Sequence, residues 1–306
     1  MPTSSSPPRS TGSTEVREDV RFRSGDAECA GWLYRPESSN GEIPCVVLAH
    51  GFGGVKEARL DAYAERFAGA GYAALVFDYR CHGESGGEPR LAIDIGRQRE
   101  DWRNALAYAR AREGIDPARI AAWGTSFSGG HVVEIAAAGE PLGAVIAQGP
   151  FMSGVAVLRC AGPAHNNRLG LAALRDLIAA RRGGSHPIPV VARPGETAAM
   201  CSPDALPGYL ALFPPGFDWP NRFLPRGTMT LPVQRPYAKA RRVTAPLLVQ
   251  VMGDDVVTPP GPARKAAERA PRGELIEYPG GHFDIYVGAP FDRAVADQIE
   301  FLDRVL

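Results

Sequence analysis

The chain has 306 residues, 44% of them hydrophobic and 22% charged, enough to build the core of one large globular domain or two smaller ones. The 34 basic and 34 acidic residues balance, which excludes the electrostatic footprint of a nucleic-acid or anionic-membrane binder. No apolar run approaches the roughly 18 residues of a membrane span, and five scattered cysteines without metal-ligand spacing indicate a reducing cytoplasm and no bound metal.

The first elements expected along the chain are a leader and a hairpin. Residues 1–15 are rich in Ser, Pro and Thr and lack the apolar segment of a signal peptide, so we expect a disordered leader. Strand-like segments over 16–23 and 28–35, joined by a turn at 24–26, predict an antiparallel hairpin at a sheet edge. The continuously apolar segment 44–50 is typical of a strand that is buried on both faces.

Helices and strands then alternate up to about residue 150. The predicted elements are a helix over 57–70, a strand over 73–78, a helix over 93–112, a strand over 119–123, a helix over 132–138 and a strand over 144–148. Asp94 near the start of its helix and Gly114 just past the end are typical start and stop signals. This alternation predicts a doubly wound, mostly parallel sheet.

The alternation breaks between residues 151 and 240. A helical patch over 168–182 is followed by a proline-rich stretch with many aromatic residues, among them Phe213, Phe217 and Trp219. We expect an inserted helical cap that roofs the site, with these three aromatics as substrate-binding candidates. The alternative is a peripheral helical decoration without substrate contact.

The sheet pattern resumes near the C-terminus. A buried strand is predicted over 246–252 and a short one over 274–278, which brings the expected sheet to eight strands. The predicted organisation is an α/β core formed by residues 16–150 and 241–306, interrupted by the cap insertion at 151–240.

Ser126 occupies the turn between the predicted strand at 119–123 and the next helix. Gly124 stands two residues before it and Ser128 two residues after it. Small flanking residues are typical of a nucleophile elbow, in which a strained turn holds the serine above the sheet. The usual pattern has glycine at both flanks, and Ser128 departs from it by its hydroxyl. The alternative interpretation is an ordinary glycine-rich turn.

An acid and a histidine follow Ser126, each just past the end of a predicted strand. Asp254 and Asp255 come after one strand, and His282 comes after the last. Because ligands bind beyond the carboxyl ends of parallel strands, these distant positions can meet there. A serine, an acid and a histidine in this order predict a catalytic triad, with both aspartates open as the acid.

Five motifs in chain order resemble those of the α/β-hydrolase superfamily, in particular its dienelactone-hydrolase-like and Xaa-Pro-dipeptidyl-peptidase-like branch. The resemblance covers nearly the whole chain from about Val16. The motifs lie at residues 50–54, 77–80 with 82–86, 124–130, 255–259 and 281–284. The resemblance implies the α/β-hydrolase fold, but it says far less about the substrate because this fold hosts many chemistries.

The resemblance also implies a role for each residue of the triad. Ser126 would be the nucleophile, and His282 the general base and later the general acid. Asp255 would orient the imidazole, because its spacing to the following Thr-Pro pair fits the family better than that of Asp254.

Backbone donors and further histidines complete the expected site. The N–H groups of Phe52 and Phe127 are implied as the oxyanion hole. His50, His82 and His131 lie nearby in the sequence, and we expect each of them to be structural.

The sequence therefore predicts a serine hydrolase that cleaves a carboxylic ester, a lactone or a related acyl bond through an acyl-enzyme, without a cofactor. The first alternative uses the same triad for elimination, C–C cleavage, acyl transfer or cyclisation in polyketide-type metabolism, which a dry pocket would favour. The second alternative is a small-molecule receptor without turnover. The expected partner is a small acyl substrate, with neither nucleic acid nor membrane, and the sequence allows a homodimer.

Overall fold

The computed structural model describes residues 16–38 and 41–306, so the predicted leader at 1–15 lies outside the described residues. Its strands are β1 (Val16–Ser24), β2 (Ala27–Arg35), β3 (Ile43–Ala49), β4 (Ala73–Phe77), β5 (Ile115–Thr125), β6 (Ala144–Gln148), β7 (Leu247–Met252) and β8 (Gly273–Tyr278). The helices that flank them are α1 (Leu60–Gly69), α2 (Ile95–Arg110), α3 (Phe127–Ala137), α8 (Pro260–Arg269) and α9 (Gly288–Val305), with a short 3₁₀ turn η3 (Asp284–Tyr286) before α9.

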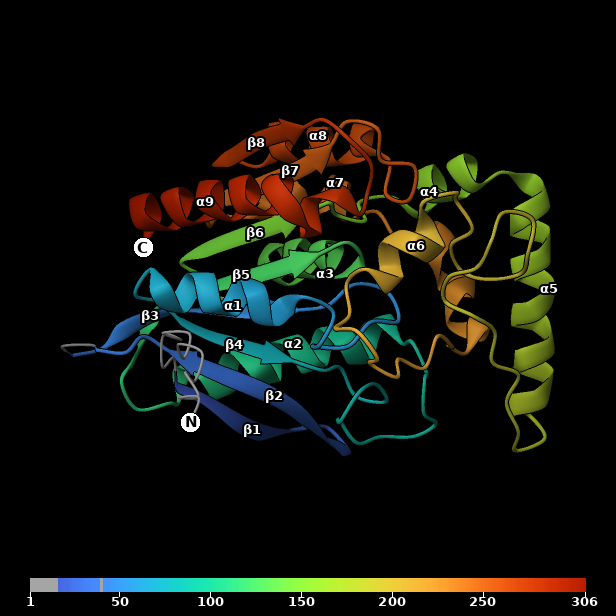
Figure 1. Cartoon of the computed structure of the whole chain (residues 1–306), viewed down its shortest axis with the longest axis horizontal. Coiled ribbons are helices and arrows are strands. Elements are labelled where there is room, and N and C mark those ends of the chain that lie inside the picture. Colours follow the sequence, from blue (N-terminus) through green and yellow to red (C-terminus); the bar gives the residue numbers. More distant parts are fainter. Residues whose placement is uncertain (1–15, 39–40) are drawn as a thin grey trace, which may run out of the picture.

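All eight strands form one sheet in the order β1-β2-β4-β3-β5-β6-β7-β8 (Figure 1). The strands β1 and β2 pair antiparallel from Val16 opposite Arg35 to Ser24 opposite Ala27, which confirms the predicted hairpin. The pair β2 and β4 is also antiparallel, and every pair from β4 to β8 is parallel. The predicted doubly wound, mostly parallel sheet of the α/β-hydrolase fold is confirmed.

Side chains alternate between two apolar layers on the faces of the sheet. In β5, Ala121 and Trp123 pack into the layer covered by α1 and α9, and Ile120 and Ala122 pack into the layer covered by α2, α3 and α8. The central strands are buried on both sides, which explains why they are continuously apolar rather than alternating.

Element boundaries differ from the sequence prediction where local signals conflict. The strand β5 begins at Ile115, four residues before the predicted start at 119. The sequence predicts the later start because the first part of the strand contains Pro117 and polar residues, which are typical of a turn. The register against β3 shifts in this region. The helix predicted over 93–112 begins at Ile95 as α2, and the Asp94 side chain caps it by accepting from the Arg97 N–H.

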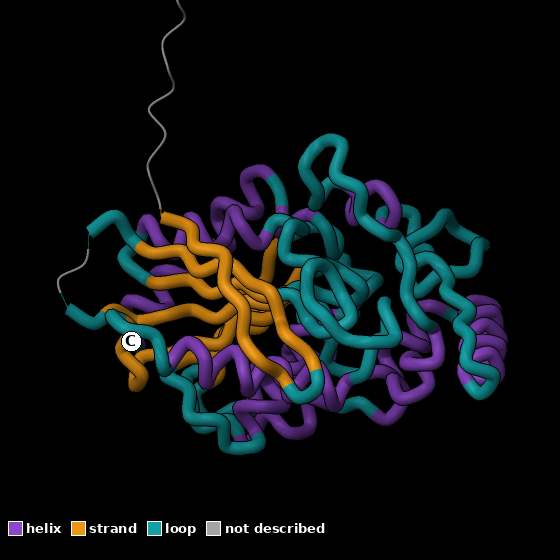
Figure 2. The backbone as a smooth tube through the Cα atoms, turned by 90° about the horizontal axis from the view of Figure 1, so that it is seen from below, coloured by secondary structure: helices purple, strands orange, loops and turns teal. Residues whose placement is uncertain are grey.

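Residues 151–240 lie between β6 and β7 in the chain, and most of them are placed beyond the carboxyl ends of the parallel strands (Figure 1). They contain α4 (Gly154–Ala161), α5 (Pro163–Ala180), α6 (Ala205–Leu210), the 3₁₀ helix η1 (Pro225–Val233) and α7 (Pro236–Lys239), followed by η2 (Ala240–Arg242). Figure 2 shows most of these helices and loops on one side of the strands. The helix α7 instead packs against α3 and α8. The helix predicted at 168–182 begins earlier, at Pro163, and α4 and α6 lack clear signals in the sequence.

In the ranges 16–38 and 41–306, we find no helix of the length and apolarity that crossing a membrane requires.

Candidate active site

Ser126 lies at the junction of β5 and α3, with φ at 53° and ψ at −117°. This left-handed conformation is strained for a residue with a side chain, and such strain is typical of functional turns. The flanking chain passes very close, because a Cβ at Gly124 would lie 2.4 Å from the Ser128 carbonyl oxygen. A Cβ at Gly51 would lie 3.0 Å from the Ser126 Cβ. The two glycines let the backbone crowd around Ser126.

The Ser128 hydroxyl, which departs from the usual glycine, is engaged in a buried polar cluster. Its Oγ lies 2.7 Å from the Tyr79 hydroxyl and 3.2 Å from the Trp102 Nε1. Trp102 also donates to Tyr79, at 2.7 Å. The Ser128 hydroxyl therefore serves as a hydrogen-bond partner for these two buried side chains, and we assign it a structural role.

Ser126, His282 and Asp255 come together as one chain of hydrogen bonds. The His282 Nε2 lies 3.1 Å from the Ser126 Oγ, and the His282 Nδ1 lies 2.7 Å from the Asp255 Oδ2. The three residues come from the ends of β5, β7 and β8 and are 8%, 5% and 2% exposed in the order Ser126, Asp255, His282. This arrangement allows a proton to pass from the hydroxyl to an imidazole whose other nitrogen is held by a carboxylate.

The two neighbouring aspartates have different surroundings. Asp254 is exposed, and its backbone N–H donates to the Gly280 carbonyl at 3.0 Å. Asp255 is buried, and its Oδ1 accepts from the N–H groups of Val257 and Thr258 at 2.8 and 2.7 Å. Only Asp255 of the two hydrogen-bonds to the histidine ring.

Thr258 is a neighbour of the triad that the sequence analysis did not single out. Its Oγ1 lies 2.8 Å from the Asp255 Oδ2, 2.8 Å from the Gly149 carbonyl oxygen and 3.1 Å from the His282 Nδ1. Because a hydroxyl has one proton, it can donate to only one of the two oxygens at a time. Its place in the motif at 255–259 was the available signal.

The N–H groups of Phe52 and Phe127 lie on the loop after β3 and at the start of α3, respectively. Phe127 is the first residue of α3, where N–H groups have no partner within the helix. Across residues 16–38 and 41–306, neither N–H donates to another protein group. Both donors are therefore free to bind a ligand oxygen, and the dipole of α3 favours negative charge there.

The loop that carries Phe52 is held from above by the insertion. The Tyr209 hydroxyl donates to the Phe52 carbonyl at 2.9 Å, and the Trp219 Nε1 donates to the Gly53 carbonyl at 3.2 Å. The rings of Tyr209 and Trp219 stack with centroids 4.5 Å apart. The insertion thus fixes the backbone of the loop that borders Ser126.

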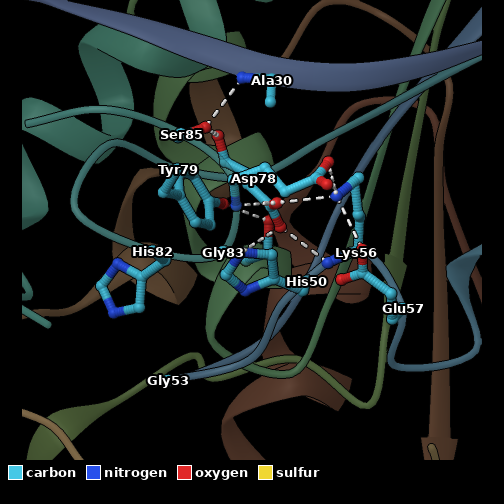
Figure 3. Close-up of polar contacts among 12 residues, drawn as sticks. Ala30, His50, Gly53, Lys56, Glu57, Asp78, Tyr79, His82, Gly83 and Ser85 are labelled. Atoms are coloured by element: carbon cyan, nitrogen blue, oxygen red, sulfur yellow. Dashed lines mark hydrogen bonds and ion pairs between the residues drawn. The ribbon is translucent and has the colours of Figure 1, made fainter. Parts of the chain in front are cut away.

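The same loop is anchored from below by a buried ion cluster (Figure 3). The Asp78 Oδ1 accepts from the Lys56 N–H at 2.7 Å, and the Asp78 Oδ2 accepts from the Glu84 N–H at 3.1 Å. The fully buried Lys56 ammonium contacts Asp78, Glu57 and Glu84 at 3.2, 2.6 and 2.7 Å. Asp78 and Lys56 therefore tie the loop after β3 to the loop after β4.

The remaining buried histidines make structural contacts. The His50 Nδ1 lies 2.9 Å from the carbonyl oxygen of the next residue, and the His82 Nδ1 lies 3.2 Å from the Arg80 carbonyl oxygen. The His131 Nε2 lies 3.0 Å from the Gln98 Oε1. Burial lowers the pKa of His50 to about 4 and that of His82 to about 3, so both rings are neutral near pH 7.

Two cavities meet at Ser126. The first, which we call the apolar cavity, has walls from Phe127 and the insertion: Phe151, Leu158, Leu169, Met200 and Leu231. The second, the His282 cavity, is bordered by His50, Tyr209, Leu212, His282, Phe283 and Tyr286. Phe52 and Met200 line both.

The three aromatic residues expected as pocket walls line neither of these cavities. Phe213 stacks between Phe217 and Trp219, with ring centroids 5.3 and 5.0 Å away. Trp219 supports the loop at Gly53 instead. Their placement does not support direct substrate contact, because the cluster lies one layer behind the cavity walls.

Comparisons with known proteins agree with this architecture. The family model for the X-Pro dipeptidyl-peptidase (S15 family) matches residues 30–197, more than half of the chain. The quorum-quenching protein AidA of Acinetobacter baumannii (strain MDR-ZJ06) is 44% identical over 94% of this chain and 95% of its own. Polyketide transferase ATR5 of Stachybotrys chlorohalonatus (strain IBT 40285) is 30% identical over 95% of this chain and 98% of its own.

Among solved structures, the alpha/beta hydrolase GrgF from Penicillium sp. sh18 matches with a TM-score of 0.78 at 24% identity, covering 95% of this chain and 99% of that one. At this identity the structural likeness shows the fold. The family match and the long relatives show more: the chain belongs to the X-Pro dipeptidyl-peptidase (S15) family of the α/β-hydrolase superfamily.

Proposed function

We propose that this protein is a serine hydrolase that cleaves a carboxylic ester, a lactone or a related acyl bond of a small molecule. The observation that carries the proposal is the buried chain of hydrogen bonds from Ser126 through His282 to Asp255, with distances of 3.1 and 2.7 Å. The relative AidA is named a quorum-quenching protein, which favours a small signal molecule among the candidate substrates.

In the proposed reaction the Ser126 Oγ attacks the acyl carbon while its proton moves to the His282 Nε2. Asp255 holds the Nδ1–H and stabilises the imidazolium. The N–H groups of Phe52 and Phe127 donate to the oxyanion, each contributing roughly 3 kcal/mol of transition-state stabilisation. The imidazolium then gives its proton to the leaving group, and water attacks the acyl-enzyme by the same route.

The two cavities favour one orientation of the bound substrate. The imidazolium must reach the leaving group to protonate it, so the leaving group belongs on the side of His282. His282 borders the His282 cavity and does not line the apolar cavity. The acyl part of the substrate then occupies the apolar cavity, against Leu158, Leu169 and Leu231.

We also propose that residues 151–240 act as the cap of this site. The support is that α4, α5 and η1 each provide a side chain to the wall of the apolar cavity, namely Leu158, Leu169 and Leu231. A roof of this kind excludes water and strengthens the electrostatic interactions beneath it.

Acyl transfer or another non-hydrolytic outcome is the second candidate. It is favoured by the similarity to polyketide transferase ATR5 along nearly the whole of both chains. The apolar walls beside Ser126 also disfavour the entry of the water that would release the acyl group. Turnover in ¹⁸O-labelled water separates the two, because hydrolysis places the label in the product acid and transfer does not.

The test of the proposed function uses small activated esters and two serine variants. Ser126→Ala is expected to lower turnover by several orders of magnitude, whereas Ser128→Ala keeps the nucleophile and retains most of the activity. Loss of activity in Ser128→Ala alone would overturn the assignment of Ser126.

A further inference from the structure

We propose that the acyl part of the substrate ends in a carboxylate, and that Arg168 binds this carboxylate at the outer end of the apolar cavity. The inference rests on the proposed function, and it names the substrate class of the same site. The residues that carry it belong to α5 and to the segment around Met200.

The apolar cavity continues into a second space, which we call the outer pocket. Val157, His165, Met200 and Val257 line both of them, so the walls are continuous. The outer pocket has Arg168 in its wall, and Ser126 lies in the wall of the apolar cavity. A molecule bound at Ser126 that extends along the apolar cavity therefore points toward Arg168.

The helix α5 contributes residues to both spaces and places Arg168 in the wall of the outer pocket. His165 and Arg168 are one turn apart and share a face of the helix, and Leu169 lies one turn after His165 on the same side. Arg168 and Leu169 are consecutive and lie about 100° apart around the helix, so Arg168 lines the outer pocket and Leu169 lines the apolar cavity.

Arg168 has no ion-pair partner among the residues that the structure describes. It forms no ion pair or side-chain hydrogen bond there, unlike many other arginines of the chain, and its Nε is shielded from solvent without an acceptor. No Asp or Glu of the described ranges lines the outer pocket. A guanidinium that is partly buried without a partner favours the binding of an anion.

The other charged groups near the pocket do not neutralise Arg168. His165 is half-buried, and burial lowers its pKa, with the Arg168 charge acting in the same direction, so the ring is neutral at pH 7. Glu196 lies near Cys201, but its carboxylate accepts from the Arg193 N–H at 2.9 Å and it does not line the pocket.

A carboxylate is the anion that this geometry favours. The guanidinium is planar and presents paired N–H donors that match the two oxygens of a carboxylate. In the orientation proposed above the leaving group lies next to His282, so the anion belongs to the acyl part, which occupies the apolar cavity. The substrate class is therefore an ester or lactone whose apolar acyl chain carries a terminal carboxylate.

The experiment compares two series of p-nitrophenyl esters of increasing chain length. One series derives from dicarboxylic acids and keeps a free terminal carboxylate, and the other derives from alkanoic acids of the same length. We expect the wild-type enzyme to show a lower KM for the carboxylate series from the chain length that reaches Arg168, by about tenfold or more. Arg168→Gln should remove this preference through KM, with kcat little changed.

Matched variants separate the contact from a general effect of charge. Arg175→Gln removes an exposed arginine of the same helix that lines neither cavity, and it should keep the preference. Arg168→Lys should keep part of it. Equal KM values for the two series in the wild type, or equal losses on both series in Arg168→Gln, would overturn the inference.

A failure of the inference is distinguishable from a failure of the proposed function. Labelling of Ser126 by a small fluorophosphonate tests the nucleophile without using the outer pocket. Labelled enzyme without a carboxylate preference rejects the Arg168 site alone. Absence of labelling together with absence of ester turnover rejects the serine hydrolase itself.

Discussion

Four donor groups face the Asp255 carboxylate, and the kind of donor differs between its two oxygens. The Oδ1 faces the backbone N–H groups of Val257 and Thr258, and the Oδ2 faces the Thr258 hydroxyl and the His282 Nδ1. The backbone bonds fix the carboxylate plane. The second oxygen is therefore aimed at the ring, and it selects the tautomer that leaves Nε2 free to accept from Ser126.

Asp255→Asn is expected to lower kcat by about 10⁴-fold with the fold intact. The backbone donors hold the amide oxygen in the place of Oδ1, so the amide NH₂ faces His282 and favours the wrong tautomer. Steady-state kinetics together with a thermal melt measure both effects. Asp254→Asn is the matched control and should change kcat less than about tenfold, since Asp254 is exposed. The reverse order of the two losses would contradict the assignment.

At this scale the sequence identified the residues but not all of their contacts. Short motifs with fixed spacing contain Ser126, His282 and the aspartate pair, and such motifs can be found in the sequence alone. The role of Trp219 is different, because its indole N–H bonds a carbonyl of the Phe52 loop. Neither the direction of this side chain nor the partner it meets is encoded in local spacing.

His50 gives the molecule a predicted sensitivity to acid. Burial lowers its pKa from about 6.5 to about 4, so the unfolded chain takes up a proton at a higher pH than the folded protein. The contribution of His50 to the free energy of unfolding is therefore fully present above about pH 6.5. It is lost as the pH falls toward 4, by up to roughly 1.4 kcal/mol per pH unit.

Urea unfolding of the wild type and of His50→Gln at pH 7, 5.5 and 4.5 measures this linkage. The variant should lose less free energy of unfolding between pH 7 and 4.5 than the wild type does. His82, whose pKa is also lowered, still contributes to the slope in both proteins. Parallel curves for the two proteins would contradict the assignment of this proton to His50.

At the scale of elements, the helix α5 has one buried face and one exposed face. Leu169 is buried in the wall of the apolar cavity, whereas Leu174 on the same helix is 48% exposed. The sequence predicts a helix from residue 168, whereas α5 begins at Pro163, a residue type that is favoured at the first helical position. The sequence does not predict the short helix α4, because Val155 and Val157 weaken the helical signal.

Leu169→Ala tests whether α5 forms part of the substrate site. Removing this apolar surface should raise KM for long-chain esters by about tenfold, since burying a leucine side chain contributes roughly 1.5–3 kcal/mol to binding. The KM for a short acetyl ester should be nearly unchanged. Leu174→Ala on the exposed face is the control. An equal change of KM for both chain lengths would mean that the insertion does not act as a cap over the acyl chain.

At the scale of the whole molecule, the sheet order brings together loops that are far apart in sequence. Ser126 follows β5, Asp255 follows β7 and His282 follows β8, and all three strands run parallel. The alternation of apolar strands and amphipathic helices was sufficient to predict a doubly wound, mostly parallel sheet, but not the order of its strands. The packing of residues 151–240 was not predictable, because their proline-rich loops have no period that fixes a direction. The homodimer and the cytoplasmic location stay predictions.

The central claim is that Ser126 is the nucleophile, and locating a covalent adduct tests it most directly. The protein is treated with a fluorophosphonate ester and digested, and mass spectrometry assigns the modified residue. We expect one adduct per chain, located on Ser126, and none in His282→Ala at the same exposure, since the general base is lost. An adduct on Ser128 or another serine, with Ser126 unmodified, would contradict the account.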